Sequence, residues 1–120
     1  MEPAAVNIAF YQGATFRKPF QWTKAGGLPA HDLTDAVLFG QVRRTVNDPE
    51  VLVEFSSTLG TVILDNGAEA RFTLFVDGPD TQSLDFEDAV WDFKVTVNGD
   101  TYPLMAGSAF VNPSPTKKFI

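Results

Sequence analysis

The sequence contains no cysteine and a single histidine, His31. The absence of cysteine excludes disulfide bonds, thiolate zinc sites and thiol nucleophiles, and one histidine excludes a metal site built from several imidazoles. Basic residues are also scarce, because nine Lys and Arg face fifteen Asp and Glu, a formal net charge of −6. We therefore expect neither nucleic acid nor a membrane among the partners.

Long apolar runs are absent as well. The first residues, "MEPAAVNIAF", lack the basic start of a signal peptide, and no later run reaches the length of a membrane span. This pattern predicts a soluble protein made in a cytoplasm. What the sequence does have is 44% hydrophobic residues, eleven of them phenylalanine, in a chain of 120 residues. That size and composition predict one folded domain with a real core.

Short apolar segments separated by turn residues predict β-structure. We expect strands over residues 6–10, 14–22, 36–44, 51–56, 61–64, 71–76, 90–97 and 101–111. Strands at this spacing, without a sustained helical period, indicate an all-β sandwich or barrel. Asn98 and Gly99 predict a tight type I′ hairpin, and only residues 81–89 favour a helical turn. We expect one β-domain over 1–112 and an extended tail over 113–120.

The segment "FYQGATFRKPFQW" is rich in aromatic residues, which can belong either to a ligand site or to the core. Phe16, Phe20 and Trp22 share one parity in an extended strand, whereas Arg17 has the other. An aromatic face in the core, with solvated basic residues, is the favoured interpretation over a ligand platform. Pro19 cannot donate to a sheet ladder, so it predicts an edge strand or a bulge.

Two further strands carry information about layers. In residues 90–97 the side chains of Trp91, Phe93 and Val95 share one face, which predicts a core strand. The run "AVLFGQV", residues 36–42, is apolar on both faces. This predicts a central strand covered on both sides, or a strand whose outer face contacts a partner.

Reactive groups are few. His31 lies beside Asp32 in a loop, but neighbours on an extended chain point apart and no nucleophile motif accompanies them, so we predict no catalytic residue. The densest acidic cluster lacks calcium-loop spacing, and we favour a solvated surface over a calcium site. Its members are Asp77, Asp80, Asp85, Glu87, Asp88 and Asp92. We expect no metal and no cofactor.

The last residues are "NPSPTKKFI", in which Pro113 and Pro115 favour extended chain. Two lysines and two apolar residues follow: Lys117, Lys118, Phe119 and Ile120. Such a segment can add to a neighbour's sheet edge or dock in its groove, and fraying is the alternative that remains open.

Three short motifs follow one another along the chain: Gly13, Thr15 and Phe16, then Asp32, Leu33 and Thr34, and last Trp91, Gly99 and Gly107. Their order resembles a group of small bacteriophage virion domains. The resemblance spans roughly nine-tenths of the chain and is a pattern of strands and turns without a catalytic signature. His31, an extra residue, and Asp35, where glycine is usual, depart from the pattern. The matching residues are Gly13, Thr15, Phe16, Trp22, Gly27, Pro29, Asp32, Leu33, Thr34, Arg43, Trp91, Asp92, Phe93, Gly99, Leu104, Gly107 and Val111.

The resemblance implies an antiparallel, immunoglobulin-like β-sandwich of about seven to eight strands. It further implies a non-enzymatic structural protein of the virion, placed in the tail, baseplate or fibre-attachment region. Other virion proteins would be its partners in a symmetric multi-copy assembly. The expected contact elements are the edge strand at Pro19, the hairpin at Asn98 and Gly99, and the tail from Lys117 to Ile120.

Three alternatives remain. The protein can be a capsid decoration or cement protein. It can be a module that binds host-surface carbohydrate, which requires Tyr11, Trp22 or Tyr102 as an exposed stacking platform. A small hydrolase that uses His31 is the third and least favoured alternative.

Overall fold

The computed structural model describes residues 3–24, 27 and 30–116. Within these residues the chain forms nine strands and one short helix. They are β1 (Ala4–Ala5), β2 (Ile8–Tyr11), β3 (Phe16–Gln21), β4 (Val37–Arg43), β5 (Val53–Ser56), β6 (Val62–Asn66), β7 (Arg71–Val76), α1 (Gly78–Gln82), β8 (Asp88–Val97) and β9 (Asp100–Asn112). The eight expected strands are all present with ends shifted by a few residues, and β1 was not predicted.

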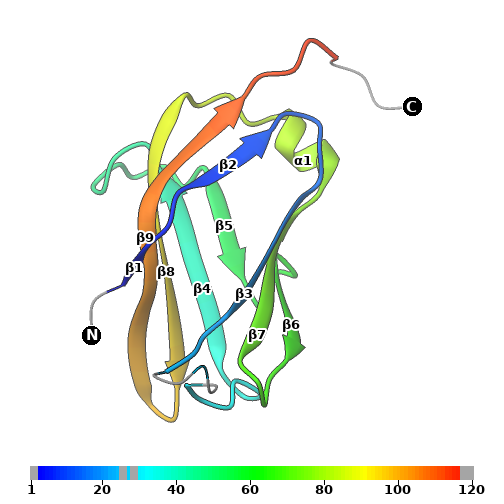
Figure 1. The fold of residues 1–120 in the computed structure, drawn as a ribbon. Helices are drawn as coiled ribbons and strands as arrows, with labels where there is room; N and C mark the ends of the chain where they lie inside the picture. Colours follow the sequence, from blue (N-terminus) through cyan, green and yellow to red (C-terminus); the bar gives the residue numbers. More distant parts are fainter. Residues whose placement is uncertain (1–2, 25–26, 28–29, 117–120) are drawn as a thin grey trace.

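Two sheets pack face to face, as Figure 1 shows. The larger sheet has six strands in the order β1-β9-β8-β4-β5, with β2 also paired to β9, and the smaller has the order β3-β7-β6. Both inner faces supply the hydrophobic core. The prediction of an all-β sandwich is confirmed, and the barrel is excluded because the sheets keep separate edges.

The first strands depart from the antiparallel prediction. β1 and β2 both run parallel to β9, whereas the remaining pairs of the sheets are antiparallel. The indole nitrogen of Trp91 donates to the Val6 carbonyl at 2.8 Å, between β1 and β2. That carbonyl lies over Gly107, where an added Cβ would come within 2.1 Å of it. A glycine at 107 therefore lets the first segment approach β9 closely.

The core is joined across the two sheets by aromatic rings. Phe72 of the smaller sheet stacks on Phe93 of the larger with 5.4 Å between ring centroids. Phe16 of the smaller sheet meets Phe10 of the larger in a tilted arrangement, with 4.5 Å between the centroids. Trp91 is only 3% exposed. The predicted inward face of Trp91, Phe93 and Val95 is confirmed. The abundance of phenylalanine reflects its use in this core, which contains Phe10, Phe16, Phe55, Phe72, Phe86 and Phe93.

β3 is an edge strand, as Pro19 predicts, because it pairs only with β7. The Trp22 N–H donates to Ala70 on the β7 side, so alternate positions back along the strand also face β7. Pro19 has the opposite parity and faces away from the ladder. A residue without an N–H fits there because that edge is unpaired.

The predicted hairpin is confirmed, whereas the predicted helical turn was misplaced along the chain. Asn98 and Gly99 have φ angles of 53° and 84° and join β8 to β9, which confirms the predicted type I′ turn. The helical turn predicted over 81–89 was placed too late, because α1 spans Gly78–Gln82. Asp77 caps its N-terminus through the Gly78 N–H, and proline occupies the first turn.

Candidate docking surfaces

The outer face of the six-stranded sheet is open to solvent in the described part of the chain. β4 lies beside the edge strand β5 and pairs with β5 on one side and β8 on the other. Val37 and Phe39 point outward there and are 49% and 36% exposed. The first alternative for this strand, cover on both faces, is therefore wrong within this chain, and the second, contact with a partner, remains open.

Charged and apolar groups alternate across this outer face. Phe39 lies beside Lys94, and Lys94 lies beside Pro103. Lys94 approaches Asp92 at 3.9 Å, where both side chains are about half exposed. An exposed pair of this kind contributes little to stability, about 0–1 kcal/mol. Its groups remain available for contacts with another surface.

A hollow of about 500 Å³ lies on the same face toward the β4–β5 loop. Arg43 lines it and donates to the Asp48 carbonyl at 2.6 Å and to the Gln41 side chain at 2.7 Å. These bonds hold the guanidinium against the sheet. The floor on β9 is Ala106 and Gly107, which leave space because alanine has only a methyl group and glycine has no side chain. Orientation of Arg43 by neutral acceptors favours recognition over proton transfer.

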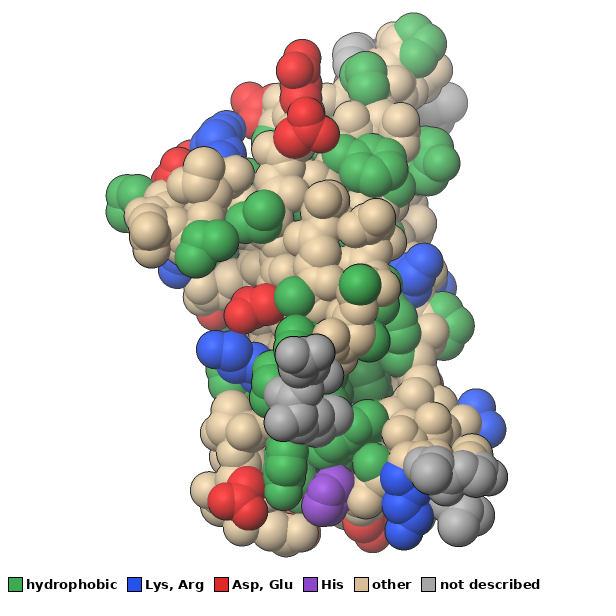
Figure 2. All heavy atoms as spheres, turned by 60° about the vertical axis from the view of Figure 1, so that its left-hand side comes forward, with side chains coloured by type: hydrophobic (Ala, Val, Ile, Leu, Met, Phe, Trp, Pro, Cys, Tyr) green, Lys and Arg blue, Asp and Glu red, His purple; other side chains and the backbone are tan. Residues whose placement is uncertain are grey.

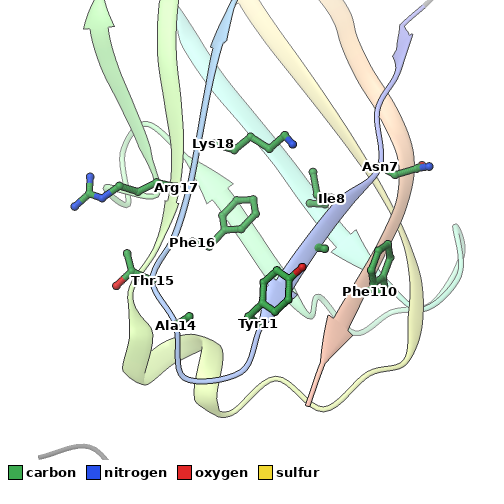
Figure 3. A pocket seen from close by; sticks show the side chains of 10 residues that line it. Asn7, Ile8, Tyr11, Ala14, Thr15, Phe16, Arg17, Lys18 and Phe110 are labelled. Atoms are coloured by element: carbon green, nitrogen blue, oxygen red, sulfur yellow. The ribbon is translucent and has the colours of Figure 1, made fainter. Parts of the chain in front are cut away.

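A second groove, of about 400 Å³, lies between β2 and β3, where the two sheets have their unpaired edges. Figure 3 shows Tyr11 and Phe110 on one wall and Phe16 and Lys18 on the other. Tyr11 is 62% exposed. Lys18 shares the inward parity of Phe16, so its half-buried side chain reaches across the groove. We name this the β2–β3 groove.

The partner-binding residues predicted from sequence are dispersed. Pro19 is exposed on the free edge of β3, and Asn98 and Gly99 are exposed at the hairpin tip. Lys117, Lys118, Phe119 and Ile120 lie outside the described residues, as does Pro29 of the resemblance. β9 ends at Asn112, and the Ser114 N–H beyond it donates to the Gln12 side chain at 3.2 Å. These contact residues and the division at residue 112 stay predictions.

The residues proposed as a sugar platform do not form one surface. Trp22 and Tyr102 pack together with His31, with ring centroids 5.0–5.4 Å apart, and all three are half-buried. Figure 2 shows the chain's histidine at one end of the molecule beside hydrophobic side chains. Tyr11 belongs to the separate β2–β3 groove. Of the three residues proposed as a platform, Trp22 and Tyr102 are thus half-buried, and Tyr11 is the exposed one.

His31 and Asp32 do not form an acid–base pair. The Asp32 carboxylate accepts from the backbone N–H of Thr34 at 2.9 Å and from the Thr34 hydroxyl. These bonds, the side-chain one first, lower the pKa of Asp32 below its ordinary value. The Asp32 carboxylate thus holds a turn in the loop that carries His31, by accepting hydrogen bonds from Thr34.

The acidic residues considered for calcium are spread over different elements. Asp77 caps α1, Asp85 faces Arg44 at 3.7 Å, and Asp92 pairs with Lys94. In the part of the chain that the structure describes, no group of three or more Asp, Glu or His side chains is arranged to hold a metal ion. The described residues also contain no helix with the length and apolar character needed to cross a membrane.

Comparison with known proteins identifies no family for this chain. No protein-family model and no curated protein matches the sequence. The fold is a β-sandwich of two sheets. One similar solved structure is that of the extracellular domains of the voltage-gated sodium channel beta4 subunit, described as parallel homodimers with a role in cell–cell adhesion. It has 11% identity and a TM-score of 0.42, and the match covers 95% of this chain and 98% of that one.

A second similar structure comes from a photo-crosslinking study of multimeric cell-adhesive interactions of sodium channel beta subunits. It has 10% identity and a TM-score of 0.40, with 98% of this chain and 99% of that one covered. Likeness at this level carries no inference about activity or partners.

Sequence reasoning missed the β2–β3 groove. The sequence did contain a signal for it, because Phe16, Lys18 and Phe20 alternate along β3 and therefore share its inward face. A lysine at an inward position of an edge strand indicates an opening between the sheets, where its ammonium group can remain hydrated.

Proposed function

We propose that this domain is a non-enzymatic structural module that binds other proteins, in many copies, within a bacteriophage virion. The observation that carries the proposal is the outer face of β4. Val37 and Phe39 stand exposed on a strand that is paired on both sides, so they offer a partner apolar contacts on a hydrogen-bonded sheet face. The surrounding charges, such as Asp92 and Lys94, suit a polar rim.

The placement in a virion rests on the residue pattern of the sequence. The matching positions include Phe16, Trp91 and Gly107, which have structural roles in the core and at the parallel junction of the first strands. Weak contacts of this kind become stable when a symmetric assembly repeats them many times. Tail, baseplate or fibre attachment is the preferred position, and capsid decoration is the alternative.

The test compares two substitutions of similar exposure on opposite sheets. Phe39→Asp places a charge at the centre of the proposed contact face, whereas Ile63→Asp does so on β6 of the smaller sheet, where Ile63 is 39% exposed. Both proteins are supplied in trans to phage that lack the gene, and incorporation into purified particles is measured. We expect Phe39→Asp to be depleted at least about tenfold and Ile63→Asp to enter normally, because a buried unpaired charge opposes association. Equal incorporation of both would refute the role of the outer face.

A carbohydrate-binding function is the second candidate, because Tyr11 remains well exposed beside Phe110. Stacking on a sugar requires such a ring. Titration of host-surface glycans, followed through chemical shifts of the Tyr11 ring, tests it. Saturable shifts would favour this function over protein docking.

A further inference from the structure

The lining of the β2–β3 groove is basic, although the chain as a whole is acidic. Its ten lining residues include Arg17 and Lys18 and no Asp or Glu, in a chain with fifteen acidic residues. Arg17 points away from the groove and its guanidinium lies 4.7 Å from the centre of the Phe75 ring. Lys18 is therefore the cation of the groove itself.

The Lys18 ammonium lacks a partner in the described residues. None of the ion pairs or hydrogen bonds found there involves it. It lies among apolar groups, with Phe16 on its own strand and Ile8 on the facing one. A half-buried cation among apolar groups gains most from a carboxylate that also brings apolar contacts, since a charge-assisted hydrogen bond is stronger where water is partly excluded.

The backbone of β3 defines the form of the ligand. Thr15 and Arg17 share the parity of Pro19, so their N–H and C=O groups face the unpaired edge beside the groove. Pro19 offers no N–H, which ends any ladder of added hydrogen bonds there. The groove lining on β3 also ends at Lys18. The edge thus accepts a short extended segment at its Thr15 end only.

We propose that the β2–β3 groove binds a short extended peptide segment of another protein, in which a carboxylate pairs with Lys18 and apolar side chains contact Tyr11, Phe16 and Phe110. This assignment does not depend on the virion placement or on the outer face of β4. The inward lysine and Pro19 also discourage indefinite strand addition, which fits a site for one short segment.

The test uses the whole protein labelled with ¹⁵N and two octapeptides, acetylated and amidated so that their ends carry no charge. The first, TVFDVDVT, has two aspartates, and the second, TVFNVNVT, has asparagine in their place. We expect the acidic peptide to shift the amide signals of Thr15 and Arg17 and to bind at least about tenfold more tightly than the neutral one, from the added charge-assisted bond.

Two lysine variants test whether Lys18 is the cation that contacts the peptide. Lys18→Gln should weaken binding of the acidic peptide about tenfold, whereas Lys94→Gln, the matched strand lysine on the outer face, should leave it unchanged. Retention of dispersed amide signals checks the fold of each variant. Since the comparison of the two peptides uses the unaltered protein, it stands even if Lys18→Gln unfolds.

Three results would overturn the assignment. They are equal binding of both peptides, absence of saturable shifts up to millimolar peptide, and shifts confined to the outer face of β4. Sedimentation of the free protein provides the remaining distinction. Concentration-dependent self-association that Lys18→Gln removes would identify a second copy of the chain as the occupant, in place of a separate partner.

Discussion

Replacement of Trp91 by phenylalanine tests the junction that fixes the first strands. The Trp91 indole N–H bonds the Val6 carbonyl at 2.8 Å, a contact between residues 85 positions apart. The ring is almost fully buried and lies 6.1 Å from Phe55 and 6.4 Å from Phe93. Phenylalanine keeps an aromatic ring in the core but cannot donate, so the carbonyl over Gly107 loses its partner.

The expected loss combines two contributions. An acceptor left without its donor costs about 1–3 kcal/mol. The smaller ring buries less apolar area, and at about 25 cal/mol per Å² this adds roughly 1 kcal/mol. Trp91→Phe should therefore lower the free energy of unfolding by about 2–4 kcal/mol. Trp22→Phe is the matched control, because Trp22 is half-buried and its indole has no hydrogen bond in the described residues, and it should cost less than about 1 kcal/mol.

Urea unfolding followed by far-ultraviolet circular dichroism measures both variants, since fluorescence changes with the tryptophan itself. Equal slopes against denaturant would show that the unfolded states are comparable. Native-state hydrogen exchange adds a local readout, because the Val6 N–H donates to Ala106 at 3.0 Å across the same junction and should lose protection in Trp91→Phe. A loss below 1 kcal/mol, or the same loss in Trp22→Phe, would refute the importance of this bond.

Three further outcomes are expected. Gly107→Ala should lower the free energy of unfolding by about 1–3 kcal/mol, because its Cβ would overlap the Val6 carbonyl, and urea titration measures this; wild-type stability would show that the approach is loose. In an NMR titration, Asp32 should have a pKa below the ordinary value and Thr34→Val should raise it. Because the folded pKa is the lower one, the stabilisation from Asp32 is present above its unfolded pKa and is lost as pH falls through the folded pKa; an unchanged pKa in Thr34→Val would contradict this. Deletion of residues 117–120 should leave the fold intact and weaken assembly, and unchanged incorporation into particles would contradict it.

Eight of the nine strands were predictable, because each of these eight has its own local signal, whereas the two-residue β1 was missed. Alternation identified the inward face of β8, and paired positive φ requirements identified the turn at Asn98 and Gly99. Pro19 identified an edge. Each of these features depends on residues that are close in sequence.

Pairing between distant segments was not predictable in the same way. β1 and β2 join β9 in parallel because of Trp91, Val6 and Gly107, which lie far apart in the chain and show no common pattern. The groove beside Lys18 also needs both sheets before it exists. The outer face of β4 was only half predictable, since an apolar strand fits burial and partner contact equally well until its neighbours are known.

We propose that this domain is a repeated structural part of a virion. Quantitative mass spectrometry of purified phage particles, with the major capsid protein and the tail proteins as internal standards, tests it most directly. We expect several copies in each particle, at an abundance matching tail or baseplate components. Abundance near that of the capsid protein would indicate decoration instead, and absence from the particles would contradict the claim.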